Sequence, residues 1–153
     1  TGDATTCEAE LSRIVRDSAS SFDLSSENGC HMLMLGLLSG VPGYEDPQSN
    51  RESGYGQYDI QLKPALSGPL SVAFTAQARR PLVTIEVKYL ARQDVPQDDA
   101  ALAEKLADLA GAALDQIAER GYDDTPLPAG VCGRLRWGFA FAGKRLAVAC
   151  REG

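Results

Sequence analysis

Two stretches with the spacing of β-strands carry charged residues at positions where a buried strand is normally apolar. Asp59 lies in the segment 55–63, which alternates polar and apolar residues, and Glu86 and Lys88 interrupt the apolar run 81–90. Because successive strand residues point to opposite faces, Glu86 and Lys88 extend from one face. Burying an uncompensated charge costs several kcal/mol, so such groups are normally paired or bound to a metal. If the two strands are neighbours, two carboxylates and a lysine meet at one place.

These groups together predict metal-assisted hydrolysis of a phosphodiester. Mg²⁺ is bound by one or two carboxylates together with waters and phosphate oxygens, and it stabilises negative charge and lowers the pKa of a bound water. We expect Asp59 and Glu86 to hold the metal, with the Val87 carbonyl as a further ligand. Lys88 is expected to position or activate the attacking water. The alternative interpretation of the three charges is a structural salt bridge at a sheet edge.

Periodicity predicts the elements that surround these two strands. The segment after Ser25 and Ser26 is apolar nearly all round and is expected to form a buried helix, while 70–76 is either a short strand or irregular. The order of elements predicts an α/β domain with a central mixed sheet flanked by helices, or an α+β domain. The expected elements are helices at 8–16, 27–38 and 94–120 and strands at 55–63, 81–90, 135–142 and 145–150.

Length and composition indicate one ordinary globular domain. The chain has 153 residues, of which 44% are hydrophobic and 24% charged, so we expect a single domain over 1–153, excised from a longer protein. No apolar stretch is long enough for a membrane span and no signal peptide is visible. A cytoplasmic location and delivery into a target cell both stay open. The four scattered cysteines are expected to be buried thiols rather than ligands or disulfides.

The net charge of −6 argues against a simple basic nucleic-acid binder, but the acidity is local. Nine of the 21 acidic residues and only two of the 15 basic ones lie between Asp94 and Asp124, and the rest of the chain is balanced. The acidic face of the helix predicted at 94–120 is either a solvated face or a surface for a basic protein partner, including an immunity-type inhibitor. A basic cleft elsewhere in the molecule is compatible with this distribution.

Five ordered motifs, spread from about Glu27 to Val148, resemble the PD-(D/E)XK nuclease superfamily. The resemblance is closest to the PD-(D/E)XK domains found C-terminal to AAA-ATPase-like domains. The matching segments are 49–60 with "SNRESGYGRYDI", 85–88 with "IEFK", 113–117 with "ALKQI", 137–145 with "YGIAFCGKR", and His31 with 33–38 for "YHGFLLGLL". Two positions depart from the pattern, because Tyr58 replaces the proline of the family name and Gln57 stands where arginine is usual.

The resemblance implies a restriction-endonuclease-like core and hydrolysis of nucleic acid, expected to be DNA, with Mg²⁺ or Mn²⁺. It implies that Gln116 assists near the attacking water and that Glu27 adds a metal ligand. The alternative role for Glu27 is an exposed acid in the first turn of a helix, and that for Gln116 is a solvated glutamine. The residues expected to contact nucleic acid are Arg51, His31, Lys144 and Arg145. The alternative for His31 is a hydrogen-bonded core histidine, and that for the three basic residues is a solvated surface charge.

Two other interpretations of function stay open. One is a catalytically inactive module of the same fold that binds nucleic acid or a protein partner. The other keeps the nuclease chemistry but assigns the domain to a toxin or effector that is delivered by a larger protein.

Overall fold

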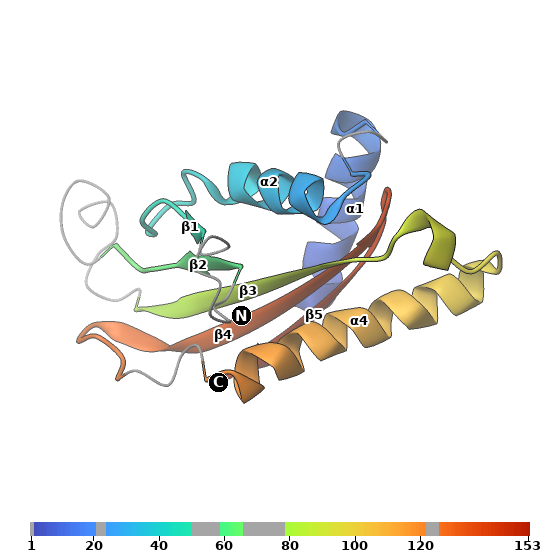
Figure 1. The fold of residues 1–153 in the computed structure, drawn as a ribbon. Helices are drawn as coiled ribbons and strands as arrows, with labels where there is room; N and C mark the ends of the chain where they lie inside the picture. Colours follow the sequence, from blue (N-terminus) through green and yellow to red (C-terminus); the bar gives the residue numbers. More distant parts are fainter. Residues whose placement is uncertain (1, 21–23, 50–58, 66–78, 122–125) are drawn as a thin grey trace.

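The computed structural model describes residues 2–20, 24–49, 59–65, 79–121 and 126–153. Within them the chain forms an α/β arrangement of three α-helices and a five-stranded mixed sheet, shown in Figure 1. The helices are α1 (Ala4–Ser18), α2 (Glu27–Leu38) and α4 (Asp99–Glu119), with a 3₁₀ turn, η1, at Arg92–Asp94. The strands are β1 (Gln48–Ser49), β2 (Ile60–Leu62), β3 (Arg80–Tyr89), β4 (Val131–Ala142) and β5 (Arg145–Glu152).

The sheet follows the order of the chain, β1-β2-β3-β4-β5. Only the β3–β4 pair is parallel, and α4 connects its two strands across one face. Figure 1 shows α4 below this face of the sheet and α1 and α2 on the opposite side. The result is a three-layer α/β/α arrangement, as expected for a parallel crossover that needs a helix to return the chain.

β3 is the central strand, and its alternating residues enter two different layers. Val83, Ile85 and Val87 join one apolar core with α1, α2 and the aromatic residues of β4. Leu82, Thr84 and Glu86 are also buried, but by alternation they point to the face covered by α4. The expectation that Glu86 and Lys88 share one face of this strand is confirmed by their direct contact.

The predicted helix bounds were partly wrong. α4 begins at Asp99 rather than Asp94, because Asp98 caps it by accepting a hydrogen bond from the Ala101 N–H (2.8 Å), and the preceding 92–94 form η1. Its end is as expected: Gly121 has φ +59°, a left-handed conformation that favours glycine. The segment predicted as strand or irregular at 70–76 lies outside the described residues, and so does the first part of the strand predicted at 55–63.

The expectation that the whole of α2 is buried was wrong. Cys30, His31 and Met34 are buried, whereas Met32 is 57% exposed and Leu37 is 37% exposed. Helix α2 lies over one face of the sheet (Figure 1), so only the side that packs on the core loses contact with water.

The cysteines also differ from one another. All four are free thiols, as expected, but Cys30 alone is buried, Cys7 and Cys150 are half-buried and Cys132 is exposed, so the expectation of four buried thiols is confirmed only for Cys30. Burial raises the pKa of the Cys30 thiol to about 12, which makes its thiolate scarce at neutral pH. No helix in the described part of the chain is long and apolar enough to cross a membrane.

Candidate active site

The β2–β3 pairing brings Asp59 to β3. Ile60 pairs with Ile85, so continuing the antiparallel register by one residue places Asp59 beside Glu86. The Asp59 Oδ2 atom accepts a hydrogen bond from the Val87 N–H at 2.8 Å. The carboxylate therefore lies at the edge of β3 on the side of β2, one residue before β2 begins. The predicted proximity of the two strands is confirmed.

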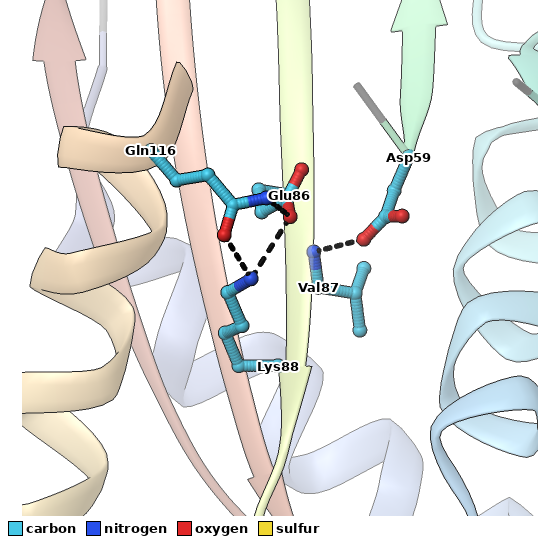
Figure 2. A network of polar contacts seen from close by, with 5 residues as sticks. All are labelled: Asp59, Glu86, Val87, Lys88 and Gln116. Atoms are coloured by element: carbon cyan, nitrogen blue, oxygen red, sulfur yellow. Dashed lines mark hydrogen bonds and ion pairs between the residues drawn. The ribbon is translucent and has the colours of Figure 1, made fainter. Parts of the chain in front are cut away.

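Glu86, Lys88 and Gln116 form a closed triangle of contacts on the α4 side of β3, shown in Figure 2. The Lys88 ammonium donates to Glu86 Oε1 at 2.9 Å and also to the side-chain oxygen of Gln116. The Gln116 amide N–H in turn donates to the same Glu86 oxygen. In Figure 2 the Asp59 carboxylate reaches β3 from the edge of the strand on which β2 lies.

Small residues on β4 allow α4 to place Gln116 this close to β3. Gly138 pairs with Glu86 in the parallel register, and a Cβ atom at Gly138 would collide with the backbone carbonyl of Ala110 in α4. Ala140 is also fully buried beneath the helix. The backbones of α4 and β4 thus approach closely, which allows the amide of Gln116 to reach Glu86.

Burial dominates the electrostatics of Glu86, which is only 4% exposed. Loss of hydration raises its pKa, and the negative charge of Asp59 raises it further. The hydrogen bond and charge of Lys88, together with the charge of Arg120, act in the opposite direction without cancelling the rise. Loss of hydration is therefore the main reason why the ionised form of Glu86 is disfavoured in the folded protein.

One oxygen of the buried Glu86 carboxylate accepts no hydrogen bond from the described residues. Glu86 Oε2 is inaccessible to water and has no hydrogen-bond partner among the residues that the structure describes. Across those same residues, no group of three or more His, Cys, Asp and Glu side chains is arranged around one ion. The donor set at the site is thus the pair Asp59 and Glu86, and Mg²⁺ commonly takes one or two carboxylates with water filling its other positions. The residues present fit that ion.

The predicted third ligand, Glu27, is not brought into a metal-binding group with Asp59 and Glu86 among the described residues. It lies exposed at the start of α2. His31, one turn further along α2, is buried, and its Nε2 atom shares a hydrogen bond of 2.9 Å with the Ser49 hydroxyl of β1. His31 therefore ties α2 to the edge of the sheet in this structure.

Lys144 and Arg145, which were also predicted to contact nucleic acid, lie away from the site. Lys144 donates to the carbonyl of Arg16 at the end of α1 (3.3 Å), and Arg145 forms an ion pair with Asp99 at 2.9 Å. Asp99 begins α4, so Arg145 is held about 25 Å along the helix axis from Gln116. Arg51 lies outside the described residues.

Sequence reasoning missed Arg120. It follows Gln116 by four residues and retains helical backbone angles (φ −85°, ψ −3°), so both lie on one side of the helix. Its charge lowers the pKa of Glu86, which places it within electrostatic reach of the site. The i, i+4 spacing from Gln116 was the available signal.

No protein-family model matches this chain, and no curated protein or solved structure is significantly similar to it.

Proposed function

We propose that this chain is a nuclease with a restriction-endonuclease-like core, which hydrolyses phosphodiester bonds of DNA with Mg²⁺ or Mn²⁺. The observation that carries the proposal is the burial of the Glu86 carboxylate and the contacts of its two oxygens. This carboxylate is buried, is contacted on one oxygen by Lys88 and Gln116, and keeps its other oxygen without a partner among the described residues.

A purely structural ion pair accounts less well for this geometry. Buried structural charges are normally satisfied at every oxygen, because an unsatisfied buried polar atom costs about 1–3 kcal/mol. Here a second carboxylate, Asp59, is close enough to raise the pKa of Glu86. Two acids beside one another and one unused oxygen are the features that a divalent cation would compensate.

Asp59 and Glu86 are the residues that would hold the cation. The N–H and carbonyl of one strand residue point to the same edge, so the carbonyl of Val87 leaves β3 on the edge where Asp59 binds its N–H. When bound, the ion would supply charge stabilisation at the phosphorus centre and a water of lowered pKa.

Lys88 and Gln116 have separate parts in this proposal. The Lys88 side chain is 27% exposed, so its ammonium can contact both Glu86 and an incoming phosphate or water, and it offsets negative charge that grows in the transition state. Gln116 contacts both Lys88 and Glu86, so it holds the two side chains at a constant separation and is a positioning residue.

A cleavage assay tests the proposal. Supercoiled plasmid, linear DNA and RNA are each incubated with the protein and Mg²⁺, Mn²⁺ or EDTA. We expect metal-dependent cleavage that Lys88→Met reduces at least about 100-fold. Lys105→Met is the matched control, because the Lys105 ammonium makes one surface hydrogen bond, to the Asp94 carbonyl; it should retain full activity.

Two outcomes would contradict the proposal. No cleavage of any substrate by the wild-type protein with either metal would favour the inactive binding module of the same fold. Cleavage that survives unchanged in both Lys88→Met and Glu86→Gln would assign the activity to other residues or to a contaminating nuclease. The unfolding temperature of each variant is measured in parallel, so that loss of fold is not mistaken for loss of chemistry.

A further inference from the structure

Arginines extend the polar face of β3 beyond Glu86. The parallel register pairs Leu82 with Arg134 and Thr84 with Arg136. Because paired residues of neighbouring strands point to the same face, both arginines lie on the α4 face, in line with Glu86 and Lys88. Their two-residue spacing puts both arginines on one face of β4, but only the pairing of β4 with β3 shows that this is the face of Glu86.

The next strand adds a third arginine to the same face. Arg136 pairs directly with Arg151 across the antiparallel β4–β5 ladder. Two like charges that are directly opposite on neighbouring strands destabilise a sheet unless anions lie near them. Arg151 forms an ion pair with Asp115 at 3.1 Å, but both side chains are more than half exposed, so a competing anion can reach the guanidinium.

The fourth arginine comes from the end of α4. Arg120 is exposed at the end of the helix, and it follows the fully buried Ile117 by three residues and Gln116 by four, so it lies on the same side of the helix as these two residues. Its influence on the pKa of Glu86 agrees with this placement. Arg134 and Arg136 are half-buried and lie against Gly153 at the end of β5.

We propose that Arg120, Arg134, Arg136 and Arg151 form a track that binds the phosphodiester backbone of nucleic acid and leads it to Glu86 and Lys88. The inference deepens the proposed function and rests on it for the identity of the anion. Guanidinium groups bind phosphate through two parallel hydrogen bonds.

The spacing of the track suits a polymer of phosphates. Arg134 and Arg136 are two residues apart on one strand, which separates their Cα atoms by about 6.6 Å, and Arg136 and Arg151 are about 5 Å apart across the ladder. Successive nucleotides rise about 3.4 Å along each strand of a duplex. The arginines can therefore contact phosphates of adjacent or next-adjacent nucleotides.

The ion pairs at the two ends of α4 provide a matched test. Arg151 with Asp115 and Arg145 with Asp99 are both surface pairs between β5 and α4, and their arginine side chains are 51% and 52% exposed. Only Arg151 lies on the proposed track. Binding of fluorescently labelled single-stranded and duplex DNA is measured by anisotropy in EDTA over a range of salt concentrations, so that no cleavage occurs.

We expect Arg151→Ala to weaken binding about tenfold and to reduce the slope of log K against log salt by about 0.7 for single strands or 0.9 for duplex DNA. Arg120→Ala should have the same effect. Arg120 is chosen as the second position because it is exposed, whereas Arg136 is half-buried and its substitution can prevent folding. Arg145→Ala should leave the affinity and slope unchanged.

Equal effects of Arg151→Ala and Arg145→Ala, no DNA binding by the wild-type protein, or tighter binding of polyglutamate than of DNA would each overturn the track. The binding assay contains no divalent cation, so its result does not depend on cleavage. A protein that binds DNA through these arginines but does not cleave it in the assay with Mg²⁺ or Mn²⁺ would refute the proposed function and leave the track intact.

Discussion

The two faces of β3 are built from different kinds of residue. On the face toward α1 and α2, Val83, Ile85 and Val87 pack into a core of large apolar side chains. On the face toward α4, Thr84 and Glu86 are equally buried but polar, and each has a buried oxygen without a hydrogen-bond partner among the described residues. One strand therefore contributes to stability on one face and retains unsatisfied polar groups on the other.

This difference indicates where the chain has been shaped by something other than stability. Apolar burial on the first face contributes about 25 cal/mol per Å². The second face loses free energy to desolvation of Glu86, and the contact with Lys88 and the charge of Arg120 offset this only in part. A face that reduces stability in the resting protein is expected to regain free energy when it binds a ligand.

The largest effect on stability should come from the apolar face. Ile85→Ala removes a side chain that is 2% exposed, so it should lower the free energy of unfolding by about 2–5 kcal/mol, measured by urea denaturation. The exposed Met32→Ala is the control and should change it little. If Ile85→Ala cost less than about 1 kcal/mol, the α1–α2 face would not be the main core.

Gln116→Leu should give the next largest effect, on activity rather than on stability. Removing the group that holds Lys88 and Glu86 together should reduce the cleavage rate about 10- to 100-fold and alter the pH–rate profile, because Glu86 loses a hydrogen bond. Asp108→Asn, a change of an exposed residue on the same helix, should alter neither. An unchanged pH–rate profile in Gln116→Leu would assign Gln116 to structure alone.

Glu86→Gln should remove a pH dependence of stability. The pKa of Glu86 is raised in the folded protein above its ordinary value of 4.5, so the folded state holds this proton more tightly than the unfolded state. Stability from this group is present below pH 4.5 and is lost as the pH rises through the raised pKa. The variant should therefore gain stability relative to wild type at pH 7 and above, and the gain should fade toward pH 4.5.

Urea denaturation at several pH values checks this sign. A difference between Glu86→Gln and wild type that stays constant with pH would mean that Glu86 ionises normally in the folded protein.

The smallest effect is expected at the start of α4. The pair Arg145–Asp99 is exposed, and isolated surface ion pairs contribute about 0–1 kcal/mol. Arg145→Ala should change the unfolding temperature by no more than a few degrees and leave cleavage unaffected. A large loss of activity would instead support the prediction from sequence that Arg145 contacts the substrate.

The site could be predicted from sequence where local rules apply. Alternation placed Glu86 and Lys88 on one face of β3, and the polar residue within the preceding strand identified Asp59. The position of Arg136 beside Thr84 could not be predicted, because it depends on the β3–β4 register, which is set by pairing between residues about 50 positions apart. Likewise Arg145 and Arg151 look equivalent in sequence, and only the packing of α4 separates them.

The start of α4 shows a different limit. Asp94, Asp98 and Asp99 are all acids of the kind that favour the first turn of a helix, so the sequence offers several starting points. The hydrogen bond from Ala101 to Asp98 selects one of them. Competing caps of similar strength cannot be ranked without the packing of the helix against the sheet.

The central claim is that Asp59 and Glu86 share one divalent cation, and Mn²⁺ binding followed by electron paramagnetic resonance tests it most directly. At pH 7.5 we predict one bound Mn²⁺ in the wild-type protein and a loss of at least about tenfold in affinity in Asp59→Asn and in Glu86→Gln. Asp115 is an exposed acid that forms an ion pair with Arg151, and the Asp115→Asn variant should bind Mn²⁺ as the wild type does. Wild-type protein that binds no Mn²⁺, or that binds it as tightly as Glu86→Gln does, would contradict the account.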